Sequence, residues 1–161
     1  MNQTWNQHVV KKENKTLVLE TIRSQTPISR ANVAQVTGLN KGTVSSLVSE
    51  LIEEDFIEES GPGVSSGGRR PVMLLFNRVA GYSIAIDLGV NYILGLLTDL
   101  NGNIVCEQRL HFQDTAFENV MQHLFEVIED LKAAAPESTY GIVGIGVGVP
   151  GVVNNDGELL L

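Results

Sequence analysis

Residues 29–55 read SRANVAQVTGLNKGTVSSLVSELIEED, and their pattern predicts two short amphipathic helices joined at Gly38. Ser29 and Asn40 are expected N-caps, because their side chains can accept a hydrogen bond from the first turn of a helix. Gly38 suits the position after a helix end, where the backbone often adopts a positive φ. In the second helix, apolar residues recur three and four positions apart and so share one face: Val44, Leu47, Val48, Leu51 and Ile52. Such a helical pair is typical of a helix-turn-helix that reads DNA.

The flanking residues extend this pattern in both directions. Residues 13–25 predict a first helix, with Asn14 as its N-cap and Pro27 marking its end. A strand is expected to start at Phe56, and Val72–Phe76 predicts a return strand after a loop rich in glycine and proline. Three helices followed by a hairpin predict a winged helix.

The second half of the chain has a different pattern. Asn101-Gly102 is a hairpin turn signal between two apolar runs. The predicted strands cover residues 82–89, 92–98, 104–110 and 142–149, and a helix is expected over 116–134. The inward side of that helix is predicted to carry Phe117, Val120, Met121, Leu124, Phe125, Ile128 and Leu131. The order β-β-β-α-β predicts an α/β lobe.

Composition narrows the class of protein. The chain has 161 residues, of which 43% are apolar, and Cys106 is its single cysteine, which excludes an internal disulfide. Its apolar runs are shorter than the roughly 18 residues that a membrane span requires, and its first residues lack the profile of a secretory signal. We therefore expect a cytoplasmic protein that does not contact a membrane.

Charge is divided unevenly along the chain. The net charge is −8, but residues 1–80 hold nine Lys/Arg and eight Asp/Glu, whereas residues 81–161 hold two and eleven. The acidity therefore belongs to the second half, and DNA binding by the first half is not excluded. Exposed charges are screened beyond about 8–10 Å, so the local sign matters more than the sum.

The candidate DNA contacts lie on the predicted recognition helix and in the loop of the hairpin. Lys41 can donate to guanine or phosphate, and the small polar residues after it can bind phosphates or base edges. Two arginines among glycines suit a narrow minor groove or the phosphate backbone. The predicted contacts are Ser29, Arg30, Asn40, Lys41, Gly42, Thr43, Ser45, Ser46 and Ser49, together with Arg69 and Arg70. Ordinary explanations stay open: serines that are merely solvated, and linker arginines that pair with the acidic residues 53–59.

An enzyme is the alternative reading of the second half. Asp87-Leu88-Gly89, Asp99 and the glycine-rich run 144–151 could place a carboxylate and backbone amides near a magnesium-bound phosphate. Buried strands with tight turns explain the same residues. The three histidines show no metal-ligand spacing, and Cys106 is expected in a strand core. The sequence therefore predicts no catalytic residue, no metal and no cofactor.

Several segments together resemble the ROK family, which joins sugar-responsive repressors with sugar kinases. They are residues 27–31, 37–46, 65–72, 81–89 and 144–151. The resemblance implies a winged helix-turn-helix over residues 1–77, with its wing at 56–76. Residues 78–161 would then be the incomplete first lobe of an actin-like, ribonuclease H-like sugar-binding domain.

The resemblance also implies a function. Such a protein is a repressor of sugar utilisation genes, here of xylose utilisation, that binds operator DNA as a homodimer and is released by a xylose-like sugar. The alternatives are a ROK sugar kinase with a regulatory N-terminal domain, and a winged helix that binds protein instead of DNA. Family kinases carry Gly-Gly-Thr after the first Asp-x-Gly, but here Val90-Asn91 follows Gly89. The family's catalytic and zinc motifs lie later than residue 161, so we expect a non-enzyme and an N-terminal portion of a longer protein.

Overall fold

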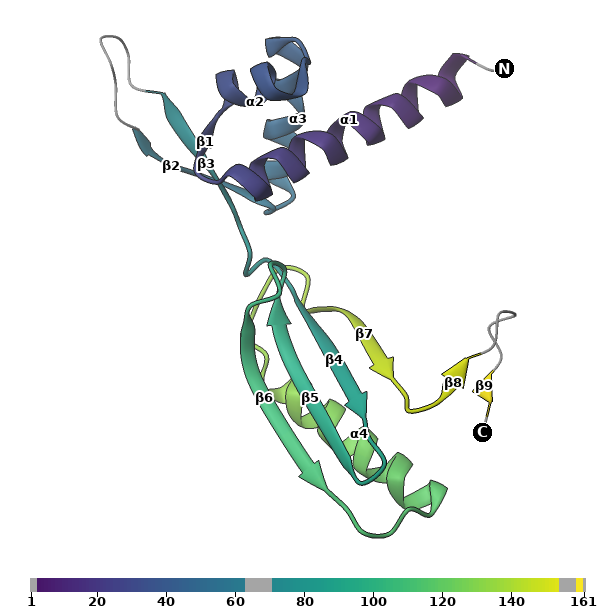
Figure 1. The fold of residues 1–161 in the computed structure, drawn as a ribbon. Helices are drawn as coiled ribbons and strands as arrows, with labels where there is room; N and C mark the ends of the chain where they lie inside the picture. Colours follow the sequence, from purple (N-terminus) through teal and green to yellow (C-terminus); the bar gives the residue numbers. More distant parts are fainter. Residues whose placement is uncertain (1–2, 63–70, 154–158, 161) are drawn as a thin grey trace. The chain divides into compact units, whose positions relative to one another are not determined.

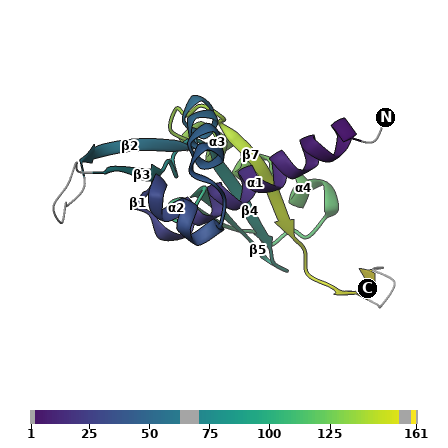
Figure 2. The ribbon, with the colours of Figure 1, turned by 90° about the horizontal axis from the view of Figure 1, so that it is seen from above.

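The computed structural model describes residues 3–62, 71–153 and 159–160. The chain divides into two compact units, residues 1–77 (the first unit) and residues 78–161 (the second unit) (Figure 1). The first unit contains α1 (Gln3–Gln25), β1 (Ile28–Ser29), α2 (Arg30–Thr37), α3 (Lys41–Glu53), β2 (Ile57–Pro62) and β3 (Val72–Phe76). Its three strands form an antiparallel sheet in the order β1-β3-β2. Figure 2 shows β2 and β3 running side by side away from the three helices.

The helix ends of α2 and α3 confirm the predicted caps. The Ser29 hydroxyl accepts a hydrogen bond from the backbone N–H of Asn32 at 3.2 Å, and the Asn40 amide oxygen accepts one from the N–H of Thr43 at 2.8 Å. Gly38 has φ +72° and donates its N–H to the carbonyl of Ala34 at 3.0 Å. The two helices are therefore held at the predicted boundaries.

The predicted start of the first helix is wrong. Helix α1 begins at Gln3 instead of near residue 13, and Asn14 lies inside it. Residues 3–12 contain neither glycine nor proline, so nothing in them stops a helix from extending toward the N-terminus. An N-cap residue marks a boundary only where the preceding backbone leaves the helix.

The core of the first unit joins all its elements. Leu17 is 45% exposed, whereas Val18 and Ile22 are fully buried. Strand β1 was not predicted, because two residues are too short for a period to show; Ile28 in it pairs with Leu74 of β3. The buried residues are Val18, Ile22, Ile28, Val33, Ala34, Val44, Leu47, Val48, Leu51, Ile57 and Leu74.

The second unit confirms the predicted β-β-β-α-β order. It contains β4 (Tyr82–Leu88), β5 (Tyr92–Asp99), β6 (Ile104–His111), α4 (Phe117–Ala134) and β7 (Ile142–Gly148), followed by a short pair, β8 (Val152–Val153) and β9 (Leu159–Leu160). The main sheet has the order β6-β5-β4-β7, with β7 parallel to β4 and the other pairs antiparallel. Helix α4 packs on β5 and β6. Gly95 permits this approach, since a Cβ there would lie 2.7 Å from both Leu131 and Val127.

Two aromatic residues of α4 are not buried as predicted. Phe117 is 72% and Phe125 is 58% exposed, whereas the buried Val127 was missed. Residues two positions apart on an α-helix point about 200° apart, so a helix that buries Val127 must expose Phe125. The predicted apolar stripe was therefore too wide on one side.

Strand β7 is also more exposed than its apolar sequence predicts. Val143, Ile145 and Val147 are 54%, 46% and 45% exposed. Within the described residues, β7 pairs only with β4, and α4 covers the other two strands of the sheet. The strand is therefore an edge strand with its apolar side chains half open to solvent.

Candidate nucleic-acid interface

Helix α3 buries one face and exposes another. Val44, Leu47, Val48 and Leu51 are buried. The opposite side presents the predicted contacts Lys41, Gly42, Ser45, Ser46 and Ser49 as exposed residues, with Thr43 half-buried. The Ser49 hydroxyl donates to the carbonyl of Ser45 at 3.0 Å. The exposed side thus carries one cation at the helix start and short hydroxyls along it, which can bond to phosphates and base edges.

Two predicted contacts have their side chains engaged as caps. Ser29 is only 6% exposed, and its hydroxyl binds the first turn of α2. Asn40 is exposed, with its amide oxygen on the first turn of α3. Ser29 sets where α2 begins, and Asn40 sets where α3 begins. The free N–H groups at the N-terminus of α3 favour a phosphate.

Arg30 is held by an ion pair. Its guanidinium lies 2.7 Å from the carboxylate of Glu59, which joins the start of α2 to β2. The sequence placed Arg30 among the DNA contacts but gave no sign of this partner. Because Glu59 offsets its charge, Arg30 has less to offer a phosphate than Lys41 does.

A second ion-pair network links α1 to the far end of α3. Lys11 lies 2.8 Å from Glu50, and Lys15 lies 2.6 Å from Glu54 and 3.5 Å from Glu50. The hydrogen bond from Lys11, followed by the charges of both lysines, lowers the pKa of Glu50 below its ordinary value. Burial alone would lower the pKa of Lys15, but its bonds to Glu54 and Glu50 raise it. Two carboxylates at the acidic end of α3 are therefore offset by lysines. The two lysines lie four residues apart, as do the two glutamates, and this matching spacing could have indicated the pairing from the sequence.

Two predicted arginines and two exposed residues that were not predicted remain to be described. Arg69 and Arg70 fall outside the residues that the structure describes, between the ends of β2 and β3. Asn32 and Gln35 of α2 are exposed polar residues that were not predicted as contacts. The sequence pattern of α2 could have indicated them, because they lie away from its buried residues, Val33 and Ala34.

The structure brings only part of the predicted phosphate site together. Asp87 pairs with Gly148 of the glycine-rich run at one end of the second unit's sheet, whereas Asp99 pairs with Tyr82 at the other end. The polar groups of the turn at Asp87–Gly89 are hydrogen-bonded to Tyr92. Tyr92 donates its hydroxyl to the Asp87 carboxylate at 2.8 Å, and its carbonyl accepts the N–H of Gly89 at 2.8 Å.

The ring of Tyr92 also closes the space above this turn. A Cβ on Gly89 would clash with the ring of Tyr92, and the Arg109 guanidinium lies 5.7 Å from the ring centre. The bond to Asp87 raises the pKa of Tyr92 above its ordinary value. The carboxylate and the amide that a phosphate would need are thus already bonded to Tyr92.

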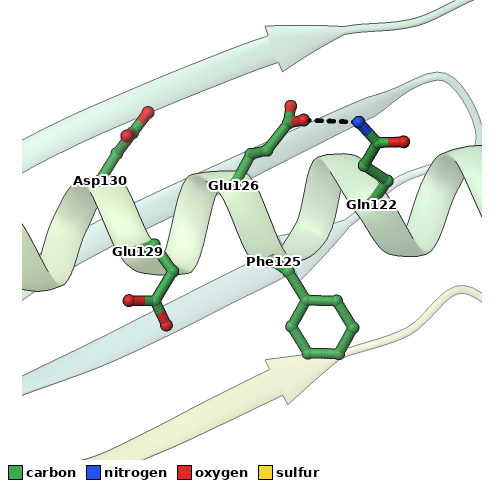
Figure 3. A pocket seen from close by; sticks show the side chains of 5 residues that line it. All are labelled: Gln122, Phe125, Glu126, Glu129 and Asp130. Carbon is green, nitrogen blue, oxygen red and sulfur yellow. Dashed lines mark hydrogen bonds between the residues drawn. The ribbon is translucent and has the colours of Figure 1, made fainter.

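The described surface of α4 is unsuited to nucleic acid. A shallow hollow on α4 is lined by Gln122, Phe125, Glu126, Glu129 and Asp130, with Gln122 donating to Glu126 at 2.9 Å (Figure 3). Its charged residues are all acidic and would repel phosphate. Cys106 is free and half-buried. Within the described parts of the chain, no three His, Cys, Asp or Glu gather as metal ligands, and no helix could cross a membrane.

Comparison with known proteins gives the family. Residues 83–161 match the model of the ROK family. The xylose repressor of Bacillus subtilis is 48% identical over 96% of this chain and 40% of its own length. The N-acetylglucosamine repressor of Escherichia coli is 25% identical over 96% of this chain and 38% of its own. The chain thus spans about two fifths of the length of these curated relatives.

A solved structure agrees with the sequence relatives. A ROK family transcriptional regulator, described as a homologue of the E. coli MLC protein, superposes with a TM-score of 0.66 at 25% identity. The match covers 91% of this chain and 37% of that regulator, so it includes parts of both units. The chain has a ROK-type fold, and its residues 83–161 carry a ROK family domain.

Proposed function

We propose that this chain carries the operator-binding part of a sugar-responsive transcriptional repressor of the ROK family. In this proposal residues 1–77 are a winged helix-turn-helix, with α2 and α3 as the helical pair and β2 and β3 as the sides of the wing. The single observation that carries the proposal is the amphipathic α3, which is capped at its N-terminus and presents Lys41 and a row of serines opposite its buried face. The names of the relatives, xylose repressor and N-acetylglucosamine repressor, support the same reading.

Each part of the first unit has a role in this proposal. The N-terminal residues of α3 enter the major groove, where Lys41 and Ser45 reach bases or phosphates. Arg69 and Arg70 of the wing contact the minor groove or the backbone. Ser29 and Asn40 hold the two helices at their starting points, and the lysines of α1 keep the acidic end of α3 from repelling the phosphates.

The remaining assignments concern the second unit and its partners. Residues 78–161 belong to the first lobe of an actin-like, ribonuclease H-like domain that binds a xylose-like sugar. The repressor acts in the cytoplasm as a homodimer on a palindromic operator, and the sugar lowers its affinity for DNA. The chain is not a kinase in this proposal, because Tyr92 takes up the groups of the turn that a nucleotide phosphate would use.

A DNA titration tests the proposal. Operator sequences are first selected from a random duplex library with this chain, and affinities are then measured by electrophoretic shift at several salt concentrations. Lys41→Ala is expected to weaken binding about tenfold, and loss of one phosphate contact lowers the salt slope by about one. Arg69→Ala/Arg70→Ala should lower the slope by about two.

Lys12→Ala is the matched control, since Lys12 is an exposed lysine of α1. It should leave both affinity and slope unchanged. Failure to select any sequence would contradict the repressor function, whereas selection with an unaffected Lys41→Ala variant would contradict only the placement of α3.

A further inference from the structure

The two units meet between consecutive residues. Asn77 is the last residue of the first unit and is only 8% exposed. Its N–H donates to the carbonyl of Phe56, and its side-chain amide donates to the carbonyl of Asp55, both at 2.9 Å. Both acceptors lie in the turn between α3 and β2, so Asn77 is fixed to the first unit by its backbone and its side chain.

Arg78 is fixed to the second unit in the same two ways. Its carbonyl accepts the N–H of Leu100 at 3.0 Å, and its guanidinium lies 3.1 Å from the carboxylate of Asp99. Two residues further on, Ala80 is 1% exposed and its carbonyl accepts the N–H of Tyr140 at 2.8 Å. The chain therefore passes from one anchored residue to the next without a linker.

Asp99 is itself a rigid anchor. It is 3% exposed and accepts hydrogen bonds from the N–H groups of Asn101 and Asn103, at 2.9 Å each, and from the side chain of Asn103. Burial alone would raise the pKa of Asp99, but these bonds and the charge of Arg78 lower it below its ordinary value. The carboxylate stays charged at neutral pH and can hold the guanidinium.

We propose that Asn77–Arg78 is a single-point hinge, and that the Arg78–Asp99 ion pair is the clamp that keeps the pivot at this point. Reorientation of the two units is then limited to the backbone torsions between two anchored residues. Hinges of this kind are a few residues that absorb a change in φ and ψ. Under the function proposed above, the second unit sets the orientation of α3 through this hinge. Only this last statement rests on the proposed function.

Loss of the Arg78–Asp99 ion pair weakens the attachment of Arg78 to the second unit. Without the guanidinium, Arg78 is held to the second unit by the single hydrogen bond from the N–H of Leu100 to its carbonyl, and the next such bond is at Ala80. When that single bond opens, two residues of extended chain, about 7 Å, become free to move. Arg78→Ala should therefore loosen the pivot.

Nitrogen-15 relaxation of the whole chain tests the hinge. In the wild type, the backbone amides of residues 77–80 should have order parameters near 0.85, as in rigid backbone. Arg78→Ala should lower the values at residues 78 and 79 measurably below about 0.85, while the strands of both units stay unchanged. Arg78→Lys, which keeps a donor and the charge, should restore part of the loss. Lys132→Ala is the control, because it breaks an exposed ion pair with Glu129 far along the sequence.

Two results would overturn the hinge. One is a wild type whose residues 77–80 already have order parameters below 0.6, and the other is an Arg78→Ala variant with unchanged values. The Arg78 side chain is 57% exposed, so a DNA contact is the rival role. A tenfold loss of DNA affinity with a salt slope lowered by one in Arg78→Ala would assign it that role instead. If the wild type binds no DNA at all, the repressor function fails while the relaxation data still decide the hinge.

Discussion

The two units bury their apolar residues to different extents. In the first unit, helices and strands converge on one core, and the residues of α3 that face it are almost completely buried. In the second unit, α4 covers β5 and β6, and the apolar side of β7 stays half open. Ile84 and Ile145 show the difference directly, because they pair across neighbouring strands yet are 1% and 46% exposed. Burial drives folding in proportion to the apolar area removed from water, so the first unit has the more complete stabilisation.

The largest expected effect tests this difference within one sheet. Ile84→Ala should lower the free energy of unfolding of the second unit by about 2–5 kcal/mol, because it leaves a cavity in the core. Ile145→Ala should cost less than about 1 kcal/mol, since half of its side chain is already in water. Denaturant titration followed by resolved NMR signals of each unit measures both. Equal losses for the two variants would show that β7 is covered in solution and would break the comparison.

A smaller effect is expected from acid. The pKa of Asp99 is lower in the folded chain than in the unfolded chain, so its charge stabilises the second unit at every pH above the unfolded value near 3.8. This contribution is lost as the pH falls through the lower, folded value. A hydrogen bond to a charged group contributes about 1.5–3 kcal/mol, which sets the scale of the loss.

Asp99→Asn is the matched variant for the acid experiment. It keeps an acceptor oxygen but cannot titrate, so the stability of its second unit should depend less on pH in the acid range below the unfolded value near 3.8. Thermal unfolding at several pH values measures this. If the stabilities of the wild type and of the variant depend on pH in the same way, Asp99 does not cause the loss of stability in acid.

The smallest expected effect concerns the N-cap of α3 in the first unit. Asn40→Ala removes the side-chain cap of α3 and should lower the free energy of unfolding of this unit by about 1 kcal/mol. Gln35→Ala, on the exposed side of α2, should change it by less than about 0.5 kcal/mol. The second unit should not respond to either change, and a response in its NMR signals would show that the units do not unfold separately.

Local signals explain what the sequence predicted correctly. The caps Ser29 and Asn40, the positive φ of Gly38 and the buried stripe of α3 all depend on residues within one or two turns. The four strands of the second unit's main sheet were also predicted, because apolar residues bounded by turn residues mark them. The order of elements therefore follows from the sequence, apart from the short strands β1, β8 and β9 and the start of α1.

Tertiary partners explain what could not be predicted. The run in β7 reads as a buried strand, but exposure depends on what packs against it, and periodicity does not report this. The same applies to the pairing of Arg30 with Glu59 and of Tyr92 with Asp87, which bring residues from different elements together. The candidate DNA surface was therefore predicted as a set of residue types, and the structure adds which of them are already engaged.

The junction between Asn77 and Arg78 also defines a place to exchange parts between proteins. Each residue keeps its bonds within its own unit, so a cut there removes no hydrogen bond that either unit uses internally. A chimera that joins residues 1–77 to the second unit of a relative needs an arginine and an aspartate at the positions of Arg78 and Asp99, and no added linker. The exchange of one unit for that of a relative would then depend on two side chains more than on the length of the chain between the units.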